Sequence, residues 1–201
     1  DIIYGGNVGK WQKFANSLRL KLAMVIADVD PGTAGAKIAA SAALPLITAN
    51  ADNALFKYVG APNNNPLSND VPPRSARQDF VMANTLVDEM NTLNDPRRAA
   101  YFTTVGGEYV GGKYGFSNVY ANFSTFSTKV TATTFPGNML DASEVNFLLA
   151  EAVERGFITG DAKSYYDAAI TASLAYWGVT GVEDYLAQAT VDYSNAGSGA
   201  S

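Results

Sequence analysis

Hydrophobic residues recur at every third or fourth position near the start of the chain. Over residues 10–29 this spacing predicts one amphipathic helix of about five turns. Pro31 and Gly32 then close the helix, because neither residue continues a helix easily. A second, Ala-rich helix is expected over residues 33–44. The apolar stripe of the first helix, whose aromatic members we expect in a core, consists of Trp11, Phe14, Leu18, Leu22, Val25, Ile26 and Val29.

The composition changes in the middle of the chain. Residues 1–59 are interpreted as mostly helical, with a short strand expected within 55–59. Residues 60–77 are rich in Asn and Pro, which predicts a loop with several turns. Helical spacing resumes over 78–95 and ends before Pro96, because the residue that precedes a proline avoids the helical conformation.

The second half of the chain alternates between irregular and helical patterns. Residues 96–140 combine glycines with aromatic side chains, which favours short strands and loops over helix. A pair of helices follows over 141–178, and either Asp141 or Ser143 can cap the first of them. A short helix is expected over 182–189. The low-complexity tail, 190–201, is expected to be disordered.

The helix pair fits the spacing of one tetratricopeptide-like unit. Small residues are required where the two helices of such a unit cross, and Ala150 and Ala162 stand at these positions. Leu174 occupies the place of the usual terminal proline, and no second copy occurs in the chain, so an ordinary helical hairpin remains the alternative. The predicted fold is mainly α, with this helix pair, a loop-rich insert of short strands, and one domain spanning 1–201.

The chain has 201 residues and contains no His and no Cys. This excludes Ser-His-Asp and Cys-His catalysis, His-based metal sites, zinc clusters and disulfides. Any chemistry has to use carboxylates, hydroxyls, amides, aromatic rings or basic side chains. The sequence indicates no metal site and no cofactor.

The charge pattern limits the possible partners. Fourteen Lys and Arg stand against 19 Asp and Glu, a net charge of −5, and no basic run occurs, so nucleic-acid binding is not expected. No apolar run is long enough to span a membrane. Residues 1–10 have neither the basic start nor the apolar core of a signal peptide.

Two sequence motifs resemble the SusD/RagB-like family. Tyr4-Gly5-Gly6-Asn7 is followed by the run KWQKFANSLRLKLAM over 10–24, which is similar to a characteristic segment of these proteins. Val25 departs from the pattern, since the family usually has Arg there. Later elements follow the family's order from Tyr4 to about Trp177: Asn94-Asp95-Pro96-Arg97, a stretch rich in Gly and Tyr, and Ala150-Glu151-Ala152 with Arg155-Gly156.

The resemblance implies a nutrient-binding lipoprotein of the Bacteroidetes outer membrane. Such a protein faces the cell exterior, is held by a lipid anchor and caps a TonB-dependent, SusC-like transporter. Family members are mostly helical, about twice as long as this chain, and begin with an acylated Cys. The resemblance therefore also implies that this is a partial chain that lacks the anchor.

Carbohydrate sites place flat aromatic rings against sugar rings and polar side chains against hydroxyl groups. The stretch 101–126 has this composition, and its glycines would allow rings to be exposed on loops. The alternative is that these aromatic residues only pack a small irregular subdomain. The predicted ligand-binding residues are Tyr109, Tyr114, Phe116, Asn118, Tyr120 and Asn122.

The predicted function is non-catalytic binding of a glycan or another nutrient oligomer for uptake across the outer membrane. Glycoside hydrolysis would need two carboxylates in a cleft. Glu108 is the best single candidate acid but has no obvious partner, while Glu151 and Glu154 share an exposed helix face. The alternative from another class is a helical-repeat adaptor that binds only protein.

Overall fold

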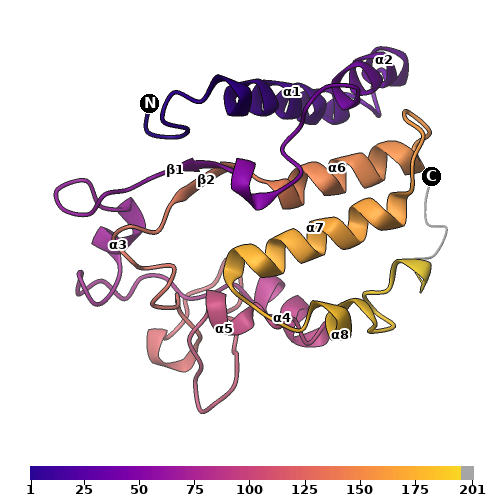
Figure 1. The fold of residues 1–201 in the computed structure, drawn as a ribbon. Coiled ribbons are helices and arrows are strands. Elements are labelled where there is room, and N and C mark those ends of the chain that lie inside the picture. Colours follow the sequence, from indigo (N-terminus) through magenta and orange to yellow (C-terminus); the bar gives the residue numbers. More distant parts are fainter. Residues whose placement is uncertain (196–201) are drawn as a thin grey trace. The chain divides into compact units, whose positions relative to one another are not determined.

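The computed structural model describes residues 1–195, which are mainly helical, as predicted. They form two compact units, described separately below: unit 1 contains 1–56, 138–176 and 192 onward, and unit 2 contains 57–137 and 177–191. The single-domain organisation stays a prediction. The α-helices are α1 (Val8–Val25), α2 (Pro31–Ala42), α3 (Pro66–Asp70), α4 (Asn84–Thr92), α5 (Arg98–Tyr101), α6 (Ala142–Glu154), α7 (Ala162–Trp177) and α8 (Val182–Leu186) (Figure 1).

Short elements complete the described chain. Strands β1 (Ala54–Phe56) and β2 (Gly137–Leu140) pair in a two-stranded sheet. The 3₁₀ helices are η1 (Asn50–Asp52), η2 (Tyr120–Asn122) and η3 (Tyr193–Asn195). None of the helices between residues 1 and 195 has both the length and the apolar character required to cross a membrane.

The core of unit 1 lies among α1, α2 and α6. Leu20, Ile38 and Val145, one from each helix, are completely buried there. The predicted helix pair is present as α6 and α7, which lie side by side (Figure 1). They contact each other through the rings of Phe147 and Tyr166, whose centres are 5.7 Å apart. Asp141 caps α6 as predicted, by accepting a hydrogen bond from the Glu144 amide at 2.8 Å.

Helix α1 ends earlier than predicted. It stops at Val25, and residues 26–29 form turns. Pro31 does not close the first helix; it begins α2, where a missing amide hydrogen costs nothing and Asp30 caps the helix through the Thr33 amide at 3.0 Å.

The buried face of α1 is not the apolar stripe. The side that is buried carries Ser17, Leu20, Ala23 and Met24, whereas Leu22 and Val25 of the stripe are 59% and 72% exposed. Residues advance by roughly 100° around a helix, so the two faces lie on roughly opposite sides. The expectation that Trp11 belongs to the core is wrong, since it is 37% exposed, while Phe14 is half-buried against the core.

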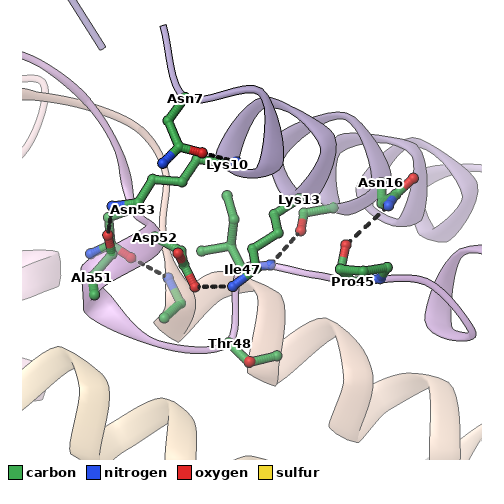
Figure 2. Close-up of polar contacts among 12 residues, drawn as sticks. Asn7, Lys10, Lys13, Asn16, Pro45, Ile47, Thr48, Ala51, Asp52 and Asn53 are labelled. Atoms are coloured by element: carbon green, nitrogen blue, oxygen red, sulfur yellow. Dashed lines mark hydrogen bonds and ion pairs between the residues drawn. The ribbon is translucent and has the colours of Figure 1, made fainter. Parts of the chain in front are cut away.

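Polar side chains of α1 hold the segment 45–53 (Figure 2). Lys13 forms an ion pair with Asp52 at 2.6 Å, and the Asn16 amide donates to the Pro45 carbonyl at 3.0 Å. The Ser17 hydroxyl accepts a hydrogen bond from the buried Ile47 amide at 2.9 Å. The motif over 10–24 therefore has two roles: its polar residues organise the following segment, and Trp11, Leu18 and Leu22 form an exposed apolar face.

Replacing Ser17 by Ala should lower the free energy of unfolding by about 1–3 kcal/mol, because the Ile47 amide stays buried without an acceptor. Asn16→Ala is the matched control. Its hydrogen bond is exposed and its loss should cost less than about 1 kcal/mol, since water replaces the donor. Urea denaturation of both variants checks this. Equal effects would contradict the role assigned to Ser17.

The helix predicted over 78–95 forms only over Asn84–Thr92. Residues 78–82 are not helical, and Ala83 forms an isolated bridge with Gly112, because the backbone at this end pairs with a distant segment. The Met82 amide donates to Ser124 at 2.8 Å, and the Gly112 amide donates to Met82 at 2.7 Å. Partners 30 or more residues away replaced the helical hydrogen bonds that the local spacing predicts.

Four other predicted boundaries differ. The loop 60–77 contains the short helix α3, capped by Asn65 through the Leu67 amide at 2.8 Å. The stretch 96–140 contains α5 and, before β2, only isolated bridges in place of strands. Helix α8 ends at Leu186 instead of 189. In the tail predicted to be disordered, residues 193–195 form η3, and 196–201 lie outside the described residues.

Candidate functional site

Ser124 organises the loops that carry the predicted ligand residues. It is completely buried, and its amide donates to the Val110 carbonyl while its hydroxyl accepts from the Val110 amide, at 2.8 and 2.9 Å. Its carbonyl accepts from Met82, so three segments of unit 2 meet at one residue. These contacts fix the backbone on both sides of residues 113–118.

Gly111 and Gly112 allow the closest backbone approach in this region. A Cβ on Gly111 would lie 2.3 Å from the Asn84 Cα, and one on Gly112 would lie 2.6 Å from Val81 Cγ2. The Asn84 amide donates to the Gly112 carbonyl at 2.8 Å, so a side chain on Gly111 would push these two backbone segments apart, whereas one on Gly112 would displace the side chains of Val81 and Asn118.

Gly111→Ala should lower the free energy of unfolding by about 1–3 kcal/mol, because the new methyl group meets backbone atoms that cannot rotate away. Gly32→Ala in α2 is the control: its nearest atom would be 3.7 Å away, and the change should be neutral or slightly stabilising. Thermal unfolding of the two variants measures the difference. An unchanged midpoint for Gly111→Ala would refute the close packing described here.

Residues 113–118 form a loop that displays two aromatic rings. The Asn118 side chain accepts from the Lys113 amide at 3.0 Å and donates to the Lys113 and Phe116 carbonyls. The Asn84 side chain accepts from the Tyr114 amide at 3.1 Å. The loop is thus braced from within and from α4, yet Tyr114 and Phe116 are 77% and 62% exposed.

A positive charge lies against one of these rings. The Lys113 ammonium is 3.9 Å from the centre of the Phe116 ring, within the range of a cation–π interaction. The ammonium group therefore lies over one face of the ring and leaves the other face open. An exposed aromatic pair on a braced loop can stack against the apolar face of a flat or ring-shaped ligand.

Tyr109 lies in a different environment. It is half-buried and packs against the small core of Val87, Met90 and Phe102. The Arg98 guanidinium lies 5.4 Å from the centre of its ring. The structure places this ring within the packing of unit 2.

The other two predicted residues are near η2. Tyr120 is half-buried and lines a small cleft of unit 2. Asn122 is exposed, and its side chain has no hydrogen-bond partner among residues 1–195. The remaining residues that line the cleft are Val71, Pro72, Arg77, Phe80, Thr125, Phe126 and Thr131.

The carboxylates considered for acid–base chemistry are placed as follows. Glu108 is exposed at a tight turn in which its backbone pairs with Val105. Glu151 forms an ion pair with Arg155 at 2.7 Å, and Glu154 accepts from the Tyr193 hydroxyl, a bond that raises the pKa of Tyr193 to about 12. Within the described part of the chain, no three acidic side chains are grouped to hold a metal ion.

The turn after α4 contains a buried ion pair, Asp95 with Arg97, and Tyr185 of α8 is hydrogen-bonded to it. Asp95 is 1% exposed and accepts hydrogen bonds from the Arg97 amide and Nε at 2.8 and 2.9 Å, and from the Tyr185 hydroxyl at 3.2 Å. Burial alone would raise the pKa of Asp95, but the hydrogen bonds and charge of Arg97 outweigh it and lower the pKa. Burial, followed by the charge of Asp95, raises the pKa of Tyr185 to about 12.

Sequence reasoning did not identify the residues that brace or accompany the exposed rings. Asn84 was assigned to the middle of a helix, although it begins α4 and reaches residue 114. Lys113 could have been recognised, since it stands three positions from Phe116 in a glycine-rich loop. Phe80 and Arg77 of the cleft carried no sequence signal.

Comparison with known proteins gives consistent matches. Residues 1–200 match the model of a SusD-like family described as "Starch-binding associating with outer membrane". No protein of curated description matches the chain significantly. The comparison of folds, in contrast, finds several solved structures.

Three of these solved structures come from two genera. A SusD homologue from Bacteroides uniformis has a TM-score of 0.83 and 37% identity, covering 94% of this chain and 41% of its own. A SusD-like protein from Bacteroides thetaiotaomicron has a TM-score of 0.79 and 35% identity, and the match covers 93% of this chain and 40% of that protein. A chitin-binding SusD homologue from Flavobacterium johnsoniae has a TM-score of 0.82 and 31% identity, and the match covers 94% of this chain and 40% of that protein. The chain therefore spans about two-fifths of the length of these relatives.

Proposed function

The chain belongs to the SusD-like family, and from this premise we propose that it is part of a non-catalytic glycan-binding protein of an outer-membrane uptake system. The observation that carries the proposal is the braced loop 113–118, which holds Tyr114 and Phe116 exposed to solvent. Large exposed aromatic side chains on a rigid loop are typical of ligand contacts, because they offer flat apolar area at little entropic cost.

The six predicted residues take different roles in this proposal. Tyr114 and the face of Phe116 away from Lys113 stack against sugar rings. Asn122 hydrogen-bonds hydroxyl groups with its exposed side-chain amide, and Tyr120 contributes through the cleft. Asn118 positions the loop through its hydrogen bonds. Tyr109 contributes to the small core of unit 2 and does not contact the ligand.

The relatives support a glycan as the ligand without defining one for this chain. The matched family is described as starch-binding, and the Flavobacterium homologue is described as chitin-binding. We therefore propose an oligosaccharide, with chitin and starch fragments as the first two candidates. For the whole protein we propose a lipid anchor in the outer membrane, exposure to the exterior and a SusC-like, TonB-dependent transporter as its partner.

A glycan array followed by calorimetry on the full-length protein tests the proposal. Binding of at least one neutral oligosaccharide is expected, with no release of shorter products over time. Turnover that disappears in Glu108→Gln would establish a glycosidase instead. Absence of any sugar binding, together with capture of a protein ligand by the same loops, would support the helical-repeat adaptor and refute the proposal.

A further inference from the structure

The cleft that Tyr120 lines in unit 2 is too small for a sugar ring. Its volume is about 20 Å³, which is room for one water-sized group. Val71 is buried and Pro72 and Phe126 are half-buried in its walls, while Phe80 is 44% exposed. A single substituent of a sugar can therefore enter the cleft from solvent, while the ring that carries it stays outside.

The cleft adjoins the base of the loop 113–118. Phe80 precedes Val81 in the sequence, and Tyr120 stands two positions after Asn118. Val81 and Asn118 lie close together, because a Cβ on Gly112 would meet their side chains at 2.6 and 3.0 Å. An oligosaccharide, which spans several sugar units, can therefore reach from the exposed rings of the loop to the cleft.

The side chains around the cleft favour a methyl group over a hydroxyl. The Thr125 hydroxyl is already bonded to that of Thr103, 3.1 Å away, and the Thr131 hydroxyl donates to the Ser127 carbonyl at 3.2 Å. A sugar hydroxyl that entered would leave water for walls whose hydroxyl groups already have partners, which is unfavourable. A methyl group of the same size loses no hydrogen bond and is stabilised by its burial.

Arg77 presents a hydrogen-bond donor at the same cleft. Its Nε donates to Asp79 at 2.7 Å, and its guanidinium lies 5.6 Å from the centre of the Phe80 ring. Nη1 is 3.9 Å from Asp70, and Nη2 has no acceptor within residues 1–195. Because the two carboxylates offset the charge of Arg77, the cleft does not favour an anion, and the remaining donor suits a neutral carbonyl oxygen.

We propose, on the basis of the proposed function, that the cleft selects N-acetylated sugars: it takes the methyl group of an acetamido substituent, and Arg77 donates to the carbonyl oxygen of that substituent. Of the two candidate ligands, this favours chitin fragments, whose units carry acetamido groups, over starch fragments, which carry only hydroxyl and hydroxymethyl groups. Arg77 and Phe80 thus determine specificity, whereas Tyr114 and Phe116 stack against sugar rings of either kind.

Calorimetric titration of the full-length protein with chitohexaose and with cellohexaose tests this inference. The two hexamers share the same linkage, but each unit carries an acetamido group in the first and a hydroxyl in its place in the second. Chitohexaose should bind at least ~10-fold more tightly. Arg77→Gln removes the donor and Thr131→Ile fills the cleft, so each should reduce this ratio of affinities several-fold. If Thr131→Ile does not fold, Arg77→Gln decides alone, since Arg77 is exposed.

Arg74→Gln and Thr128→Ile are the matched controls, because both residues are exposed and neither lines the cleft. They should leave the ratio of affinities unchanged, and so should Tyr114→Ala, which weakens the binding of both hexamers alike. Equal or weaker binding of chitohexaose, or a ratio that a folded cleft variant leaves unaltered, overturns the inference while the proposed function stands. Absence of binding to any sugar refutes both.

Discussion

Replacing Tyr114 or Phe116 by Ala should weaken oligosaccharide binding by at least ~10-fold each, and replacing both should abolish measurable binding. Each ring offers its exposed face to the ligand, and the loss of one stacked aromatic ring is worth about 1.4 kcal/mol or more, which is a factor of ten in Kd. Calorimetric titration of the full-length protein with the best oligosaccharide from the array measures this. The fold should not change, because both side chains project into solvent.

Val119→Ala provides the matched control. Val119 is 66% exposed and close in sequence to both rings, but it offers no flat face for stacking. Its Kd should stay within about twofold of the parent value. A loss of affinity in Val119→Ala as large as in Phe116→Ala, or unaltered affinity in the double variant, would show that the ligand does not use the proposed pair.

Removing the Asp95 carboxylate should destabilise unit 2 by about 3–5 kcal/mol, because Asp95→Ala leaves the Arg97 guanidinium half-buried and unpaired with this partner. The same change removes the acceptor of the Tyr185 hydroxyl and so loosens α8. Urea denaturation, followed with a probe in unit 2, measures the loss. Asp79→Asn is the control, since its ion pair with Arg77 is exposed and its loss should cost less than about 1 kcal/mol.

Low pH should reduce the stabilisation that the Asp95 carboxylate gives to unit 2. The pKa of Asp95 is lower in the folded protein than its ordinary value of 3.8, so the folded state favours the charged form. The stabilisation is therefore complete above pH 3.8 and is lost as the pH falls through the lower, folded-state pKa. The stability of Asp95→Asn should depend less on pH in this range than that of the parent. Parallel pH profiles would contradict the assignment of this carboxylate.

The helical scaffold could be predicted where local signals agree with tertiary contacts. Asp141 begins α6 as its sequence position indicates, because the side chain reaches the Glu144 amide whatever the rest of the chain does. Residues 78–83 show the reverse case. Their spacing favours helix, but the backbone of Met82 is hydrogen-bonded to Gly112 and Ser124 instead, and no local sequence signal indicates such distant partners.

The burial of α1 could not be predicted from hydrophobicity. The pattern identifies the helix and its apolar stripe, but the buried face carries Leu20 beside the small residues Ser17 and Ala23, and the Ser17 hydroxyl accepts a hydrogen bond from a buried amide. A strong apolar stripe indicates that this face of the helix is more stable when it is covered. It does not tell whether the covering element belongs to residues 1–195, and here the described residues leave it uncovered.

The composition of the sequence indicated which stretch holds the candidate site, but not how its side chains are arranged. Glycines and aromatic residues mark the stretch 101–126, and Tyr114 and Phe116 are exposed there. That Tyr109 is half-buried depends on α4 and α5, which pack against its ring from separate positions in the sequence. That Asn84 braces the loop depends on a backbone approach which only Gly111 and Gly112 permit.

The crystal structure of the full-length protein with the best-binding oligosaccharide tests the central claim most directly. A sugar ring should lie about 4–5 Å from the plane of Tyr114 or of the face of Phe116 opposite Lys113, with the backbone of 113–118 unchanged. An oligosaccharide bound elsewhere, with both rings still in solvent, would contradict the account.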